Sequence, residues 1–230
     1  LAQDPERASG VEFVWVQFPG IGREDYLGLH PQSRQTVFFM SPSVRIGLHE
    51  NRASLLGLDY PGIARYLQHG APFDLVIGHF SPPDAEGWCS AGVSHDFLPI
   101  AWPRAKRRIA QINPAMPSVH GGFRVHVSEL DSALEADTPL AEFAETHASG
   151  DITTRIGQHA AGFVRDGDTL QFGIGAVPLA LAGALTGHRD LRLHTGMVSQ
   201  AARSLHEAGA LVCVEGIETD VELRVIRDLG

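Results

Sequence analysis

The chain has 230 residues, of which 43% are hydrophobic and 20% are charged, so it is long enough and apolar enough to bury a sizeable core. Its formal net charge is -9, from 27 acidic and 18 basic residues. This balance argues against a general surface for nucleic acid or for anionic membranes, and an anionic ligand would need a local positive site.

Cysteine usage and hydropathy indicate where the protein works. Cys89 and Cys213 are the only cysteines, and two widely separated cysteines are typical of reduced thiols in a cytoplasmic protein. No apolar run approaches the roughly 18 residues of a membrane span, and no signal peptide opens the sequence. Lys106 is the only lysine among the 18 basic residues, a bias that we interpret as bacterial base composition. We therefore expect a cytoplasmic, bacterial protein.

The first half of the chain alternates short apolar runs with turn chemistry. A short helix is expected over residues 61–70, with Pro61 at its first position and Gly70 past its end. The Pro- and Gly-rich residues 81–96 are expected to form a loop. Strands are expected where runs are apolar and rich in β-branched or aromatic residues, at residues 11–18, 36–40, 73–80 and 108–113.

A polar, small-residue stretch from about residue 140 to 150 predicts a boundary between domains 1–148 and 149–230. Beyond it, helices and strands alternate, and Asp151 is the candidate N-cap of the first helix. The expected helices are 151–164, 178–185, 199–209 and 219–230, and the expected strands are 169–175, 191–196 and 211–216. This alternation predicts the α/β class, with right-handed βαβ units and a parallel sheet.

Two small-residue loops follow consecutive strands of this second half. GIGAVP occupies residues 173–178 and HTGM occupies residues 194–197. Ligands of open α/β sheets bind beyond the carboxyl ends of the strands, so both loops are expected to face one site. Gly173 and Gly175 would let the backbone approach a ligand closely, and Pro178 near the helix start leaves amides directed at an anion or oxyanion.

A dinucleotide site is one alternative for the glycine loop. The pattern GxGxx is present, but Pro178 stands where the third glycine of the fingerprint belongs. The acidic residue expected about 20 positions later is replaced by His194, Thr195 and Gly196. A nucleotide-binding oxidoreductase is therefore disfavoured.

Four ordered motifs carry a resemblance to a known family. They are FDLVIGHFSPPDAEGWCSAGVS (73–94), AKRRIAQINPAMP (105–117), DGDTLQFGIGAVP (166–178) and DLRLHTGM (190–197). Through them, residues 11–209 resemble the acetyl-CoA hydrolase and 4-hydroxybutyrate CoA-transferase family. The resemblance implies a parallel-sheet, NagB/RpiA-like domain followed by the start of a second similar domain, with the active site between them. It also implies that the family's amino-terminal start and most of its second domain lie outside these 230 residues.

The family's chemistry, as the resemblance implies it, uses a glutamate that attacks the acyl-CoA thioester. An acyl-glutamyl anhydride forms, the thiolate returns to give a glutamyl-CoA thioester, and CoA passes to an acceptor acid. Backbone amides stabilise the oxyanion, which gives GIGAVP the role of carbonyl-polarising loop and HTGM that of nucleophile loop. The residues expected to bind the substrate and CoA are Gly173, Ile174, Gly175, Ala176, Met197 and Ser199.

The nucleophile position of this chain departs from the family pattern. The glutamate that follows the HT or HS pair in the family is Gly196 here. Thr195 and Ser199 offer hydroxyls, which usually serve as helix N-caps, and His194 could act as the base of a thioesterase. The catalytic positions are therefore His194, Thr195 and Gly196, and a catalytically silent acyl-CoA-binding or scaffold protein is the alternative.

The expected partners are an acyl-CoA and a small carboxylic acid, with coenzyme A as a substrate and no tightly bound cofactor. A homo-oligomer or a complementing subunit is also expected. No metal site is expected, because His120 and His126 lack clustered ligands.

The remaining motifs are interpreted as structural. Ser94, His95 and Asp96 are adjacent, so their side chains cannot align as a triad. Asp84 and Glu86 are expected to be turn acids rather than a catalytic pair. The basic run 104–108 is expected to be solvated. Residues 210–230 resemble a short piece of an EAL-type phosphodiesterase and are expected to add one strand and one helix.

Overall fold

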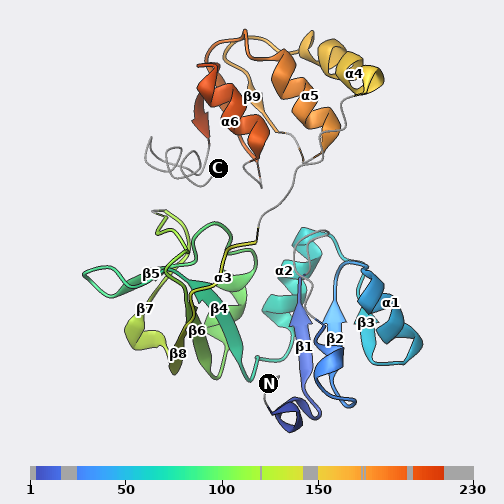
Figure 1. Ribbon diagram of the computed structural model, residues 1–230, viewed down its shortest axis with the longest axis vertical. Coiled ribbons are helices and arrows are strands. Elements are labelled where there is room, and N and C mark those ends of the chain that lie inside the picture. The colour runs from blue at the N-terminus through green and yellow to red at the C-terminus, as the bar shows by residue number, and fades with distance from the viewer. Residues whose placement is uncertain are drawn as a thin grey trace. The chain divides into compact units, whose positions relative to one another are not determined.

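The computed structural model describes residues 4–16, 25–119, 121–141, 150–171, 173, 175–195 and 199–214 (Figure 1). The chain divides into two compact units. Unit 1 comprises Leu1–Phe80, Ser94–Ala115 and His126–Phe143, and unit 2 comprises Ser81–Val93, Met116–Val125 and Ala144–Gly230. The three-stranded sheets in the described residues are all parallel, as the α/β prediction requires.

The first sheet of unit 1 has the strand order β1-β2-β3. Its elements are β1 (Glu12–Trp15), β2 (Arg34–Val37), α1 (Pro42–His49), β3 (Ala53–Leu55) and α2 (Tyr60–His69), with short 3-10 turns at Pro5–Ala8 and Leu27–Leu29. The Asp59 carboxylate accepts the Gly62 N–H and caps α2, so the helix begins one residue before Pro61. Residues 17 and 18 of the first predicted strand lie outside the described residues.

The second sheet of unit 1 has the strand order β4-β6-β8. Its elements are β4 (Val76–Phe80), α3 (Leu98–Ala101), the 3-10 turn Trp102–Arg104, β6 (Arg108–Ile112), the 3-10 turn Val127–Glu129 and β8 (Ser132–Glu135). Phe80 is fully buried, and its ring meets that of Trp102 edge-on at 5.2 Å. The strands expected over 73–80 and 108–113 are confirmed, whereas β8 was not predicted because its side chains are all exposed.

Residues 81–96 are not wholly a loop, which corrects the sequence prediction. They contain the strand β5 (Trp88–Ser90), which pairs with β7 (Arg124–His126). Ser90 is fully buried, and its hydroxyl accepts the N–H groups of Gly92 and Val119. Because that pairing joins segments far apart in sequence, neighbouring turn residues gave no signal for it.

The three-stranded sheet of unit 2 has the strand order β11-β10-β9, with a helix before each strand. Its elements are α4 (Asp151–Ala161), β9 (Thr169–Leu170), α5 (Ala176–Ala184), β10 (Leu191–Leu193), α6 (Gln200–Glu207) and β11 (Leu211–Val214). Buried residues of β10 and α6, including Leu191, Leu193 and Leu205, form its core. The predicted parallel βαβ arrangement is therefore confirmed in this unit.

Several predicted boundaries in unit 2 were wrong by a few residues. Gly150 is the N-cap of α4, and Asp151 is the first helical residue, where a carboxylate complements the helix dipole. The helix α5 begins at Ala176, so Pro178 is its third residue. The strands expected over 169–175 and 191–196 are shorter than predicted. Residues 215–230, which include the expected last helix, lie outside the described residues.

Candidate active site

The two loops singled out by sequence follow strands that pair directly with each other. The strands β9 and β10 run parallel, with Leu170 opposite Leu193. The backbone N–H of His194 donates to the carbonyl oxygen of Leu170 at 2.9 Å. The glycine loop and the His194 loop therefore leave the same edge of the sheet at adjacent positions, which is where ligands bind in α/β folds.

Gly175 has a backbone conformation that glycine alone adopts readily. Its φ is 128° and its ψ is -179°, and it is the N-cap of α5. A Cβ atom added at Gly173 or at Gly175 would meet no heavy atom within 4 Å. The backbone of this loop thus borders open space, as a close approach by a ligand requires.

The start of α5 supplies donors at this edge. Ala176 and Val177 are its first two residues, and their N–H groups have no acceptor within the helix. Pro178 follows and has no N–H group. Two adjacent amides at a helix N-terminus can polarise a carbonyl oxygen or hold an oxyanion.

His194, Thr195 and Ser199 lie around the carboxyl end of β10. His194 is exposed, and Thr195 and Ser199 are half-buried. Ser199 is the N-cap residue of α6, but its side chain makes no capping hydrogen bond. The prediction that Ser199 holds a cap position is confirmed, and the hydrogen bond that usually accompanies such a position is not observed.

Six of the predicted site residues lie within the described part of the chain, whereas Ile174, Gly196 and Met197 lie outside the described residues. The other predicted site residues follow β9 or β10 and lie at the carboxyl edge of this sheet: Gly173, Gly175, Ala176, His194, Thr195 and Ser199.

The acidic residues of the DGD motif build the turn before β9. Asp166 accepts the Arg189 backbone N–H at 3.1 Å and contacts Nδ1 of His188 at 2.9 Å. These contacts lower the pKa of Asp166 below its ordinary value, the Arg189 N–H having the largest effect. Asp168 accepts the Arg165 N–H. This motif thus ties the turn before β9 to the turn before β10, at the amino ends of both strands.

Asp84 is a turn residue, as predicted. Its carboxylate accepts the N–H groups of Glu86 at 3.1 Å and Trp88 at 2.8 Å, and it pairs with Arg124. The Trp88 N–H is the largest of the effects that lower the pKa of Asp84. The Arg124 guanidinium also lies 5.6 Å from the centre of the Trp88 ring. These contacts stabilise the turn before β5.

Ser94, His95 and Asp96 do not form a triad. Asp96 has a φ of 39°, which turns the chain at this point. Partial burial raises the pKa of the Asp96 carboxyl. Burial, followed by the Asp96 charge, raises the pKa of Tyr60. This segment therefore shapes the start of α2, where the Tyr60 and Phe97 rings pack at 5.3 Å.

The remaining polar motifs also have structural partners. The Lys106 ammonium pairs with Asp74 at 2.7 Å, and the Arg108 Nε donates to the Trp102 carbonyl at 3.0 Å. His126 accepts the Ser128 N–H in a capped turn, and His120 lies outside the described residues. No group of three or more potential metal ligands occurs in the part of the chain that the structure describes.

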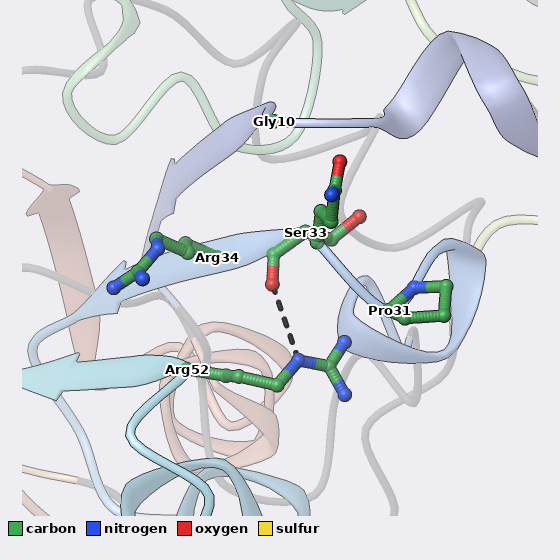
Figure 2. A pocket seen from close by; sticks show the side chains of 6 residues that line it. Gly10, Pro31, Ser33, Arg34 and Arg52 are labelled. Atoms are coloured by element: carbon green, nitrogen blue, oxygen red, sulfur yellow. Dashed lines mark hydrogen bonds between the residues drawn. The ribbon is translucent and has the colours of Figure 1, made fainter.

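Sequence reasoning missed a cavity of about 390 Å³ in unit 1, shown in Figure 2. It lies near the amino end of β2, the end opposite to that at which α/β sheets bind ligands. The Arg52 guanidinium donates to the Ser33 carbonyl at 3.3 Å and the His30 carbonyl at 2.9 Å, and pairs with Glu50 at 3.1 Å. These contacts commit Arg52 to holding the loop before β2.

No protein-family model matches the chain, but individual relatives do. It is 31% identical over 212 residues to the 4-hydroxybutyrate coenzyme A transferase of Clostridium kluyveri, covering 92% of this chain and 49% of that protein. A solved 4-hydroxybutyrate CoA-transferase of Porphyromonas gingivalis matches with a TM-score of 0.71 at 29% identity, over 88% of this chain and 54% of that one. RipA of Yersinia pestis gives a TM-score of 0.80 at 25% identity, over 91% of this chain and 51% of that one.

The chain spans about half or less of the length of the curated relatives that it matches. The likeness of residues 210–230 to EAL-type phosphodiesterases finds no support in these comparisons. No helix among the described residues has the length and apolar character needed to cross a bilayer. Over the part that it shares with them, the chain belongs to the 4-hydroxybutyrate CoA-transferase family in both sequence and fold.

Proposed function

We propose that this protein moves coenzyme A between a short-chain acyl-CoA thioester and a carboxylic acid, or hydrolyses such a thioester. The observation that carries the proposal is the pairing of β9 with β10, which sets the glycine loop beside His194 and Thr195. The curated relatives support it, since each of the strongest matches is named as a CoA transferase.

In this proposal, the glycine loop binds the thioester carbonyl. The amides of Ala176 and Val177 donate to its oxygen, and the open space beside Gly173 and Gly175 admits the acyl group. Coenzyme A is a substrate and leaves with each turnover. Ile174, Met197 and Ser199 are the other residues proposed to contact it.

The two reactions differ in the nucleophile. Transfer needs a carboxylate, whose oxygen bonds to the acyl carbon as the C–S bond breaks and the thiolate departs. Hydrolysis needs a water molecule at the same carbon, with His194 accepting the proton of the water and returning it to the leaving thiolate. Gly196 stands at the family's glutamate position, so transfer by this chain needs another carboxylate, and a silent acyl-CoA-binding protein is the alternative.

The decisive experiment measures the exchange of isotopically labelled acetate into acetyl-CoA by the native chain and by Gly196→Glu. Release of free thiol and binding of acetyl-CoA are measured on the same samples. Exchange by the native chain would show that another group replaces the glutamate. Exchange by the variant alone would establish an intact scaffold that lacks its nucleophile.

The other outcomes are equally informative. Thiol release without exchange would identify a thioesterase, with His194→Gln as the next variant. Binding without any turnover in either protein would favour the silent acyl-CoA-binding protein. Absence of binding in both proteins would overturn the proposed function.

Further properties belong to the same proposal. We propose a cytoplasmic, bacterial protein with domains at residues 1–148 and 149–230. We also propose that it works as a homo-oligomer or with a complementing subunit. Neither nucleic acid nor a membrane is part of the proposed activity, in keeping with the net charge of -9.

A further inference from the structure

The strand β10 presents an arginine and a histidine on the same face of the unit 2 sheet. Its residues Leu191 and Leu193 are buried in the core that α5 and α6 complete. Arg192 and His194 alternate with these leucines and are exposed. Because alternate residues of a strand lie on opposite faces, Arg192 and His194 share the outer face, which α5 and α6 do not cover. They lie about 6.6 Å apart along the strand.

The neighbouring strand adds neutral polar residues to this outer face. Thr169 of β9 lies opposite Arg192 and is exposed. Gln171, two residues further along the chain, is exposed as well. His194 follows β10 at the same level, since its N–H donates to the Leu170 carbonyl at 2.9 Å. The carboxyl end of the outer face is therefore polar, and it borders the expected site.

Arg192 gives this end of the face a fixed positive charge. Within the described residues, its guanidinium makes no hydrogen bond or ion pair. The carboxylates of Asp168 and Asp190 belong to the amino ends of β9 and β10, and Asp168 accepts the Arg165 N–H. Asp166 is engaged by the turn before β10. In a chain of net charge -9, Arg192 thus supplies the local positive charge that an anionic ligand needs.

The position of Arg192 decides which anionic group it can reach. The proposed place of the thioester carbonyl, at the amides of Ala176 and Val177, lies past the carboxyl ends of β9 and β10. Arg192 is two residues behind His194, an interval that a long arginine side chain can span. The phosphates of coenzyme A lie a whole pantetheine arm away from the thioester. A carboxylate at the far end of a short acyl chain is closer, and it can accept two parallel hydrogen bonds from a guanidinium.

We infer that Arg192 determines acyl specificity and selects thioesters whose acyl group ends in a second carboxylate. The guanidinium pairs with that carboxylate, and the Thr169 hydroxyl and the Gln171 amide are further hydrogen-bonding groups on the same side of the site. The thioester carbonyl stays at the glycine loop. This inference rests on the proposed function and adds to it the class of acyl group.

Isothermal titration calorimetry of the full chain with succinyl-CoA and with butyryl-CoA tests the inference. The two acyl groups have the same number of carbon atoms and differ in charge. The native chain is expected to bind succinyl-CoA about tenfold more tightly, which is the effect of a hydrogen bond to a charged group. Arg192→Gln should remove this preference, and Arg192→Glu should reverse it. Arg192→Lys, which keeps the charge and loses the planar fork, should retain part of it.

Arg165→Gln is the matched control. Arg165 is an exposed arginine in the turn before β9, at the opposite end of the same strands. Its substitution changes the net charge by the same amount and should leave the ratio of the two affinities unchanged. Circular dichroism should show native melting in each variant, because both side chains are exposed.

The possible failures are distinguishable. Equal affinity of the native chain for the two thioesters would overturn the inference and leave the proposed function intact, as would a preference that survives Arg192→Gln. Binding of neither thioester would overturn both. Free succinate is titrated as a third ligand. Its binding through Arg192, together with equal affinity for the two thioesters, would assign Arg192 to the acceptor acid and contradict the inference.

Discussion

The segment from Ser81 to Ser90 follows β4, and the glycines Gly173 and Gly175 follow β9. Both sets of residues belong to family-like motifs, yet their surroundings differ. In the first, the Asp84 carboxylate and the Ser90 hydroxyl bind backbone N–H groups. In the second, Gly173 and Gly175 border open space. Side chains that accept several backbone N–H groups hold the first segment in one conformation. The two glycines have no side chains, so the backbone beside them is open to a ligand.

Substitution of Gly175 tests whether the open backbone at the glycine loop serves a ligand, and it has the largest expected effect on activity. A φ of 128° strains any residue with a Cβ atom, so Gly175→Ala should displace the amides of Ala176 and Val177. We expect acyl exchange or thiol release, in whichever form of the chain is active, to fall by about 100-fold. Kinetics at saturating acetyl-CoA provide the measurement.

Gly183→Ala is the control for Gly175→Ala. Gly183 lies inside α5 and has no heavy atom within 4 Å of an added Cβ. Alanine there should retain activity and stabilise the helix by about 0.5–1 kcal/mol. Equal activities in the two variants would contradict a role for the Gly175 backbone in catalysis.

Gly157→Leu tests the packing of α4 against α5, the helix whose N-cap is Gly175. A side chain at Gly157 would collide with the Ala180 backbone, which cannot move without shifting α5. We expect a loss of about 3 kcal/mol in the free energy of unfolding, measured by urea denaturation. Gly183→Leu, on the same pair of helices, should cost little, and a similar loss in both variants would show that Gly157 does not mediate close packing.

Ser90→Ala tests the hydrogen bonds that the Ser90 side chain accepts in the segment from Ser81 to Ser90. Removal of the Ser90 hydroxyl leaves the N–H groups of Gly92 and Val119 without their acceptor. The expected loss is about 2 kcal/mol in the free energy of unfolding. Ser132→Ala in the exposed strand β8 should change that free energy by less than about 0.5 kcal/mol. Acyl-CoA binding by Ser90→Ala should persist under conditions in which the variant is folded.

The comparison also shows what the sequence could predict. Apolar runs predicted most strands. In β4 and β10 every second residue is buried, and these buried positions need the apolar or small residues that made the runs visible in the sequence. The pairing of β5 with β7 was missed because it joins residues far apart in the chain. Gly175 was recognised from its pattern, and its φ of 128° gives a physical reason for a glycine there.

The smallest predicted effect concerns His79, at the carboxyl end of β4. Burial lowers the pKa of this imidazole below its ordinary value of 6.5, and its buried Nε2 has no hydrogen-bond partner in the described residues. The unfolded chain therefore binds the proton more tightly than the folded chain does. Stability should fall as the pH decreases from about 7.5 through the unfolded pKa, and should level off below the folded pKa.

Urea denaturation of the native chain and of His79→Gln across this range measures the effect. The variant should show a flatter dependence of the unfolding free energy on pH. The raised pKa of Asp96 acts in the opposite direction, because the folded carboxyl keeps its proton to higher pH than the unfolded one does. Asp96→Asn should therefore not flatten the loss of stability on acidification that His79→Gln removes. A loss that depends on Asp96 and not on His79 would show that burial at the end of β4 does not disfavour the charged imidazole.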